Sequence, residues 1–370
     1  KRGISIKRIS PIDNKASAIF RKSRIVIDLN ASKLLAISQI PEIKDCVLDD
    51  KGRVFRLVYK LAQGGEGRIY TTNSNYVCKV YKKSKINELR IKKLQLMVSK
   101  QIKGQDICWP RSVAYNEKKE LIGYLMDEAQ GRSLQTTIFT PPLFKKHLPD
   151  WTRTELVALC SGILDKIEIL HNNNVIIGDL NPMNILVMPN AQSYFVDTDS
   201  YQVEQFPCPV GQINFTAPEI QGKDFKTFLR TPENDHFALA TLLFMILMPG
   251  KAPYSHQGGS DPASNIKKKN FPYPFQYEDK EGKEHLDFKW EAPLGQWRFI
   301  WSHFPYSVKK AFYSTFKKSD RINIQDWKKI MNQYKFMLSE GYTTDEIFPK
   351  SYREVSHYEE TAFPKKIEGV

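Results

Sequence analysis

Long apolar runs are scarce in this sequence. The longest, FALATLLFMILM from Phe237 to Met248, has twelve residues. A run of that length is too short to cross a bilayer as a helix and fits a buried core helix instead. The N-terminus is basic and has no apolar segment of the kind that a signal peptide carries. These absences predict a chain with no membrane span that works in the cytoplasm.

Cysteines are few, and none is paired in a CxxC motif. An odd, scattered set of this kind argues against both a disulfide framework and a zinc site, and it predicts buried thiols in a reducing compartment. The five are Cys46, Cys78, Cys108, Cys160 and Cys208.

Acidic residues are outnumbered, 41 against 55 basic ones, which leaves a net charge of +14 over 370 residues. Such a charge suits nucleic acid, an acidic surface or a phosphorylated ligand. The basic residues are spread along the whole chain, however, and no helix-turn-helix, zinc or RNA-binding signature accompanies them. We therefore interpret the charge as a lysine-rich solvated surface, and a non-catalytic nucleic-acid-binding protein is the weakest alternative.

Strand patterns come first along the chain and helix patterns follow. From Val54 to Tyr81 the pattern is strand-like, with a turn at Asn73-Ser74-Asn75, and after Pro149 it is mainly helical. This order predicts an α+β fold with two lobes. We expect a basic N-terminal extension over 1–50, a β-rich lobe over 51–130, a helical lobe over 131–338 and a tail over 339–370. Within the extension, RIVIDL (Arg24 to Leu29) is strand-like.

The β-rich region holds a glycine-rich bend and a lysine that lies in the middle of a strand. LAQGGEGRIY places glycines where backbone can approach phosphate oxygens without a Cβ in the way. Lys79 is flanked by apolar residues, and a buried lysine needs a counter-charge. Glu88 is the only acidic residue between Lys79 and Asp106 and lies on a predicted helix that Ser84 can cap. The sequence therefore predicts a Lys79–Glu88 ion pair.

The stretch VIIGDLNPMNILV brackets a polar loop with apolar residues. Asp179 and Asn184 share this loop, and Asp197 ends a strand about a dozen residues later. An asparagine and an aspartate can supply hard oxygen ligands to Mg²⁺, and a second aspartate can accept a substrate proton. The alternative interpretation is that these residues only stabilise turns, where Asp and Asn are also common. With the upstream lysine and glycines, the set matches the needs of phosphoryl transfer.

At these residues the chain resembles a protein kinase from about Val54 to Leu338. The resemblance implies that Asp179, Lys79 and Glu88 are catalytic and that Asn184 and Asp197 hold Mg²⁺. It also implies that Asp235 begins the buried helix and that Arg321 pairs with Glu219 of TAPEI. The implied cofactors are ATP and Mg²⁺, with ATP held by Ala62, Gly64, Gly65, Gly67, Val77, Lys79, Met126, Asp127 and Ala129.

More narrowly, GGEG, GDLNPMNIL and DTDSYQ resemble an atypical branch of bacterial Ser/Thr protein kinase-like proteins. That branch is often encoded beside a PP2C-type phosphatase and a von Willebrand A-domain protein, which implies a PP2C-type phosphatase as a partner. Three features depart from the usual kinase pattern. Gly178 replaces an arginine that would bind a loop phosphate, Asn181 replaces a lysine, and Thr198-Asp199 replaces Phe-Gly.

The leading hypothesis is a Mg-ATP-dependent Ser/Thr protein kinase whose substrate is unknown. It keeps the residues that touch metal and nucleotide, and the missing arginine predicts activity without activation-loop phosphorylation. One alternative is a pseudokinase, a nucleotide-binding scaffold. Another is a small-molecule kinase of the aminoglycoside-phosphotransferase type, against which TAPEI and Arg321 count.

Overall fold

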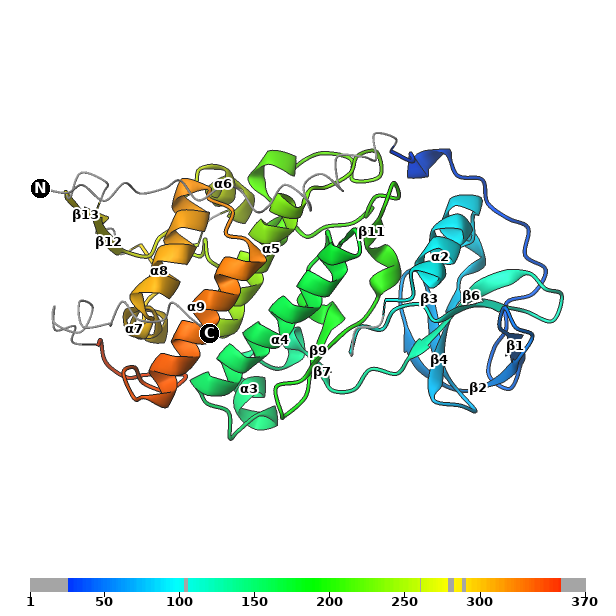
Figure 1. Ribbon diagram of the computed structural model, residues 1–370, viewed down its shortest axis with the longest axis horizontal. Helices are drawn as coiled ribbons and strands as arrows, with labels where there is room; N and C mark the ends of the chain where they lie inside the picture. The colour runs from blue at the N-terminus through cyan, green and yellow to red at the C-terminus, as the bar shows by residue number, and fades with distance from the viewer. Residues whose placement is uncertain (1–25, 103–105, 260, 279–282, 288–290, 354–370) are drawn as a thin grey trace, which may run out of the picture.

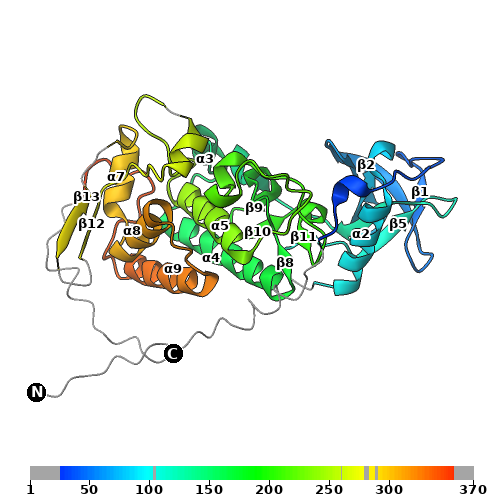
Figure 2. The same ribbon diagram turned by 90° about the horizontal axis from the view of Figure 1, so that it is seen from above.

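A barrel of strands forms one end of the molecule, and most of the helices lie at the other (Figure 1). The computed structural model describes residues 26–102, 106–259, 261–278, 283–287 and 291–353. Viewed from above, the β-rich lobe again stands apart from the helical lobe (Figure 2). The predicted two-lobed α+β architecture is therefore confirmed.

The β-rich lobe is a closed antiparallel barrel with the strand order β1-β2-β3-β4-β6-β5. The predicted turn at 73–75 joins β3 to β4. The barrel begins before residue 51, because β1 pairs with both β2 and β5 and closes it. Its strands are β1 (Cys46–Leu48), β2 (Val54–Gln63), β3 (Gly67–Thr72), β4 (Tyr76–Tyr81), β5 (Ser112–Tyr115) and β6 (Leu121–Asp127).

A single long helix, α2 (Glu88–Lys100), accompanies the barrel. It begins three residues later than a Ser84 cap would place it, because Ser84 lies in the 3₁₀ turn η2 (Lys83–Lys85). The actual cap is Asn87, whose side chain accepts a hydrogen bond from the Arg90 backbone at 2.8 Å.

The segment before β1 runs from the helical lobe to the barrel. Ile27 donates its backbone N–H to the Gln205 carbonyl at 3.0 Å, while Leu35 donates to the Ile86 carbonyl at 3.0 Å. Between them lies the 3₁₀ turn η1 (Leu29–Ala31). No strand forms over 26–29, and the rest of the predicted RIVIDL strand lies outside the described residues. The segment thus links both lobes by backbone hydrogen bonds.

The helical lobe is built around α5, which is buried without interruption from Phe237 to Leu247. A helix that is apolar on all sides belongs in a core, so the predicted core helix is confirmed. Helix α4 packs beside it (Figure 1). The helices are α3 (Pro141–His147), α4 (Arg153–Asn172), α5 (Pro232–Leu247), α6 (Pro262–Lys267), α7 (Gln296–His303), α8 (Tyr306–Tyr313) and α9 (Ile324–Ser339), with the π-helix η8 (Ser314–Lys318).

Short strands and single turns line the side of this lobe that faces the barrel. The strands pair as β10-β9-β7 and β11-β8, and a separate hairpin β12-β13 lies at the far end. They are β7 (Arg132–Ser133), β8 (Val175–Ile176), β9 (Ile185–Val187), β10 (Ser193–Phe195), β11 (Gln202–Val203), β12 (Phe275–Glu278) and β13 (Glu284–Asp287). The 3₁₀ turns are η3 (Leu134–Thr136), η4 (Pro182–Asn184), η5 (Thr198–Ser200), η6 (Ile213–Phe215) and η7 (Pro218–Ile220).

The residues after α9 fold back onto the start of α4. The buried Arg153 guanidinium donates to the carbonyls of Leu247 at 3.0 Å and Ile347 at 2.6 Å. This one side chain therefore ties α4, α5 and the C-terminal segment together. Each of these bonds involves a charged donor, and such bonds are stronger than neutral ones.

No helix among the described residues is long and apolar enough to cross a bilayer. All five cysteines are free thiols, and four of them are buried, as the spacing predicts.

Candidate active site

The glycine-rich bend joins β2 to β3 over the face of the barrel that meets the helical lobe. The Gly64 N–H donates to the Gly67 carbonyl at 2.9 Å and closes the turn. A Cβ on Gly67 would lie 2.4 Å from the Val80 carbonyl oxygen, so only glycine lets β3 approach β4 there. Gly64 and Gly65 face open space. Ala62 opposes Ile69 at the end of the ladder.

Lys79 is buried in β4 and contacts two carboxylates. Its Nζ lies 2.5 Å from Asp197 Oδ1 and 2.6 Å from Asp199 Oδ1. Burial works to lower the pKa of Lys79, but the two carboxylates outweigh it and raise that pKa. The expectation that this lysine needs a counter-charge is met by the loop after β10 and not by α2.

Glu88 is not the partner of Lys79, so the predicted ion pair is wrong. The Glu88 side chain is exposed at the first position of α2, and its backbone N–H donates to the Lys33 carbonyl at 3.1 Å. At that position the carboxylate favours the positive end of the helix dipole. Glu88 is the only acidic residue between Lys79 and Asp106, but the carboxylates that contact Lys79 come from much later in the chain.

Asp199 accepts hydrogen bonds from several buried donors. The Tyr81 and Tyr124 hydroxyls lie 2.8 Å and 2.9 Å from its carboxylate oxygens. Its backbone carbonyl accepts from Lys93 Nζ at 2.8 Å. Burial alone would raise the pKa of Asp199, but Lys79 and Arg90 hold it well below its usual range. Asp199 is therefore an anion fixed between the barrel and α2.

Two cations on α2 face this anion. Arg90 forms a two-pronged ion pair with Glu66 of the glycine-rich bend, at 2.6 Å and 2.9 Å, and also lies 3.8 Å from Asp199 Oδ2. Burial lowers the pKa of the neighbouring Lys93 to about 8. The helix thus presents positive charge where the prediction required a carboxylate.

The residues predicted to meet the adenine lie on neighbouring strands. Val77 of β4 pairs with Met126 of β6, and both are buried. Asp127 ends β6, and its carboxylate pairs with Arg111. Ala129 follows and packs against the apolar core of the barrel. This places an apolar wall at the end of β6, where the chain leaves the barrel for the helical lobe.

Asp179 lies in the loop between β8 and η4. Burial raises its pKa, while the Arg230 guanidinium and a hydrogen bond from the Gln212 backbone act in the opposite direction. Its Oδ1 is buried and has no hydrogen-bond partner within the described part of the chain. A buried carboxylate oxygen without a donor is costly, which suggests that it meets a hydroxyl of a bound molecule. Asn181, at the position of the usual lysine, caps η4 by accepting from the Met183 backbone at 2.9 Å.

Asn184 and Asp197 fit a magnesium site. The Val196 N–H donates to the Asn184 carbonyl at 2.9 Å, which places these two ligands on adjacent strands of backbone. The Asp197 side chain is 42% exposed, whereas that of Asp199 is only 4% exposed. The Asp197 carboxylate is therefore partly open to solvent while its Oδ1 pairs with Lys79. Two protein oxygens suffice for Mg²⁺ when phosphate oxygens and water complete its shell.

The space that a side chain at residue 178 would occupy is filled by Arg230, from elsewhere in the chain. Gly178 adopts a positive φ of 73°, and a Cβ on it would lie 2.1 Å from Nη1 of Arg230. The buried Arg230 guanidinium donates to the Val210 carbonyl at 2.6 Å and stacks on Phe225 with its Cζ 4.2 Å from the ring centroid. A cation thus occupies the space beside the catalytic loop although residue 178 carries none.

Two further contacts brace the loop and the TAPEI segment. Asp235 at the start of α5 accepts from the backbone N–H groups of Ile177 and Gly178 at 2.7 Å and 2.8 Å. Arg321 donates to Glu219 at 2.9 Å, so that predicted ion pair is confirmed. The first contact anchors the loop to α5, and the second joins the TAPEI segment to the residues before α9.

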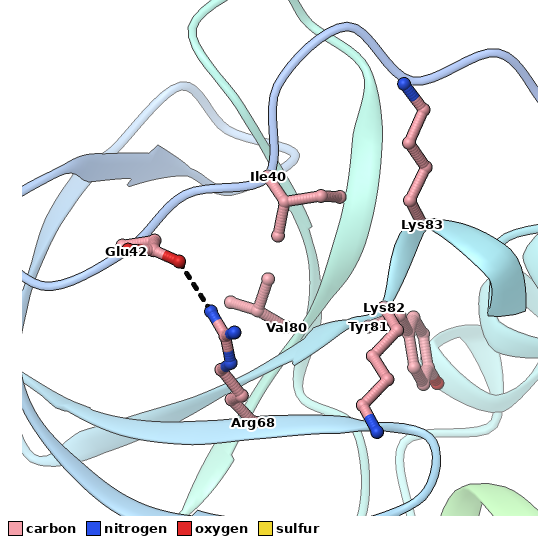
Figure 3. Close-up of a pocket in the computed structure, with 7 residues that line it drawn as sticks. All are labelled: Ile40, Glu42, Arg68, Val80, Tyr81, Lys82 and Lys83. Carbon is pink, nitrogen blue, oxygen red and sulfur yellow. Dashed lines mark hydrogen bonds and ion pairs between the residues drawn. The ribbon is translucent and has the colours of Figure 1, made fainter.

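A small pocket opens on the barrel between the N-terminal segment and strands β3 and β4 (Figure 3). An ion pair at 2.6 Å between Arg68 and Glu42 crosses it. None of the residues predicted to bind nucleotide lines it. The lining residues are Ile40, Glu42, Arg68, Val80, Tyr81, Lys82 and Lys83.

Three functional candidates escaped sequence reasoning: Asp199, Arg90 and Arg230. Asp199 could have been found from DTD, since two aspartates beside one buried lysine invite pairing. No sequence motif near Gly178 points to Arg230. It lies 52 positions later in the chain and meets Gly178 only in the folded structure.

Comparison with known proteins agrees with this geometry. The model of the protein kinase domain family matches residues 55–298. Protein kinase YegI of Escherichia coli O157:H7 is 28% identical over 207 residues, which cover 53% of this chain and 32% of that protein. The cGMP-dependent protein kinase, isozyme 2 forms cD5/T2, of Drosophila melanogaster is 27% identical over 237 residues, which cover 60% of this chain and 23% of that protein.

The chain thus spans about a third or less of the length of these relatives. The family match, in contrast, covers well over half of the chain and takes in the glycine-rich bend, Lys79, the catalytic loop and the TAPEI segment. This chain belongs to the protein kinase domain family.

Proposed function

We propose that this chain is a Mg-ATP-dependent Ser/Thr protein kinase of the atypical bacterial branch. The observation that carries the proposal is the meeting of Lys79 with Asp197 beneath the glycine-rich bend, with Asp179 on the neighbouring loop. Bound ATP would meet Val77 and Met126 with its base and Lys79 with its phosphates. Mg²⁺ would be held by Asn184 and Asp197 and would neutralise charge on the phosphate oxygens.

Asp179 is the group that orients the acceptor. It accepts the proton of a Ser or Thr hydroxyl while that oxygen forms a bond to the γ-phosphorus and the bond from the γ-phosphorus to the β,γ-bridging oxygen breaks. ADP leaves, and the proton passes on to solvent. Asn181 supplies no positive charge at the position of the usual lysine, so a slow turnover is expected.

A protein acceptor is favoured over a small molecule by the contact between Glu219 and Arg321. This pair holds the TAPEI segment, which in a protein kinase supports the peptide substrate. A small-molecule kinase has no need of that brace.

Activity without a loop phosphate is supported by the surroundings of Gly178. Arg230 already holds the loop through the Val210 carbonyl, and no arginine at residue 178 is available to bind a phosphate. Two of the loop hydroxyls are engaged: Thr198 donates to the Cys108 carbonyl at 2.9 Å and Thr216 to the Gln212 carbonyl at 2.7 Å. A PP2C-type phosphatase is the partner we propose for reversing the reaction on substrates.

Labelled ATP and a generic basic protein test the activity. Asp179→Asn should lower the rate about 100-fold or more, roughly 2.7 kcal/mol in barrier, with nucleotide affinity nearly unchanged. Asp197→Asn should weaken Mg²⁺-dependent nucleotide affinity as well. Nucleotide binding by the wild type without any transfer would indicate a scaffold, and transfer to aminoglycosides alone would indicate a small-molecule kinase.

Phosphatase treatment tests the loop. Protein shown by mass spectrometry to lack phosphate on Thr198, Ser200, Tyr201 and Thr216 should react at its full initial rate. A rate that starts near zero and rises as one of these residues becomes phosphorylated would contradict the proposal.

A further inference from the structure

The contacts of Lys79 divide its two carboxylates into a movable one and a fixed one. Asp197 is 42% exposed and is the residue expected to turn toward Mg²⁺. Asp199 is 4% exposed and lies 2.6 Å from Lys79 Nζ. When Asp197 binds metal, Asp199 is the carboxylate that remains on Lys79. The lysine therefore keeps a buried counter-ion in both situations.

Asp199 is held on several sides. Its carboxylate accepts from the hydroxyls of Tyr81 on β4 and Tyr124 on β6, and its carbonyl accepts from Lys93 on α2. The turn that carries it is fixed in the helical lobe, because the Thr198 hydroxyl donates to the Cys108 carbonyl at 2.9 Å. A carboxylate held this firmly loses little further freedom in fixing the lysine.

Helix α2 presents positive charges to Asp199, whereas the sequence predicted a carboxylate on this helix. It turns Arg90 and Lys93 inward, three residues apart and hence on one face, and leaves Glu88 in solvent. Six charges then balance around the cleft. The cations are Lys79, Arg90 and Lys93, and the anions are Glu66, Asp197 and Asp199.

We propose that Asp199 is the residue that positions Lys79 for nucleotide, in place of a carboxylate on α2. Helix α2 then acts on the site through cations: Arg90 holds both Asp199 and Glu66 of the glycine-rich bend, and Lys93 holds the Asp199 backbone. Movement of α2 would release the bend rather than strip the lysine of its partner. This inference rests on the proposed nucleotide site, but it does not require phosphate transfer.

A double-mutant cycle on the full chain tests the proposal by ATP affinity. Asp199→Asn should raise the Kd for Mg-ATP about tenfold or more, whereas the matched control Glu88→Gln should leave it within about twofold. In a Lys79→Met background, Asp199→Asn should have no further effect, because Asp199 acts through Lys79. Asp197→Asn in the same background should still weaken binding, since Asp197 acts through the metal.

Rescue by a conservative variant gives a readout that a merely structural role would not move. Asp199→Glu keeps a carboxylate for Lys79 and should recover part of the Mg-ATP affinity that Asp199→Asn loses. The groups facing Lys79 are Asp197, Asp199 and the Tyr81 and Tyr124 rings, with Arg90 behind them.

Tyr81→Phe and Tyr124→Phe provide a second route if Asp199→Asn does not fold. Each removes one donor to Asp199, and each should raise the Kd for ATP by a few fold, again only while Lys79 is present. An equal effect of Glu88→Gln and Asp199→Asn, or additivity of Asp199→Asn with Lys79→Met, would overturn the proposal. Failure of the wild type to transfer phosphate, with ATP still bound, would count against the proposed function alone.

Discussion

The cleft and the core of the helical lobe are held together by different interactions. Around the buried Lys79 the contacts are ion pairs of about hydrogen-bond length, 2.5 Å to Asp197 and 2.6 Å to Asp199. Around Phe244 of α5 they are ring contacts, with centroids 5.1 Å from Phe312 and 5.5 Å from Tyr273.

The two kinds of contact fail in different ways. An ion-pair network depends on each partner, because removal of one leaves an uncompensated buried charge. An aromatic core depends on volume, because its attraction is spread over many weak contacts. Single isosteric changes should therefore disturb the cleft selectively, whereas loss of volume should disturb the fold as a whole.

The largest effect is expected from Phe244→Ala. The buried ring fills space among Phe271, Phe312, Phe316 and Trp301, so the change should cost about 3–5 kcal/mol of unfolding free energy. Denaturant unfolding measures this cost. The folded fraction should still bind nucleotide within about twofold of the wild type, and Phe244→Leu should lose less stability. If Phe244→Ala greatly weakened nucleotide binding without lowering the unfolding free energy, the proposed difference between cleft and core would be wrong.

A difference in pH response is the next largest expected effect. Burial lowers the pKa of Lys93 to about 8, so the unfolded chain holds that proton more tightly than the folded one. Stability should therefore rise as the pH increases from about 8 to 10.5. The gain should be about 3 kcal/mol relative to Lys93→Met. Unfolding of both proteins at several pH values measures it, and parallel curves would contradict the assignment.

His236 on α5 should make the stability of the fold sensitive to acidic pH. Burial, together with neighbouring His171, lowers its pKa to about 4. The unfolded chain takes up a proton first as the pH falls from 6.5 toward 4, so stability should be lost over that window. The loss should be about 3 kcal/mol relative to His236→Gln. Equal acid sensitivity of the two proteins would show that His236 does not drive it.

The smallest effect is expected from Arg321→Ala. Its partner Glu219 is 45% exposed, and a pair of that kind contributes about 0–1 kcal/mol. In the proposed function TAPEI supports a protein substrate, so the effect on activity should be larger than the effect on stability. KM for a protein substrate should rise while that for ATP stays constant. Arg321→Lys, which keeps the charge, should retain part of the wild-type KM. A rise in both constants would place the defect elsewhere.

Much of the fold and part of the site could be predicted from local pattern. The turn at 73–75, the core helix and the pair formed by Glu219 and Arg321 were all predicted and are confirmed. The glycine-rich bend and the polar loop have short sequence signatures because their conformations depend on neighbours in the chain. The nucleotide and metal roles of their residues remain predictions.

The remaining contacts of the site could not be predicted from neighbouring residues in the sequence. Glu88 is the nearest acidic residue in sequence, but it is the first residue of α2, after the cap Asn87, and its side chain is exposed. Asp199 is 120 positions away from Lys79, and the sequence marked it only as a departure from the usual kinase pattern.

The sequence by itself therefore determined the two-lobed α+β class, the buried helix and the chemical types gathered for phosphoryl transfer, because hydrophobic period and turn residues act over a few positions. Only the tertiary structure decided which charges meet. It paired Lys79 with Asp199 and brought Arg230 to the empty place beside Gly178. The physical reason is that ion pairing depends on distance in space after folding, and a buried charge takes the partner that packing places within reach.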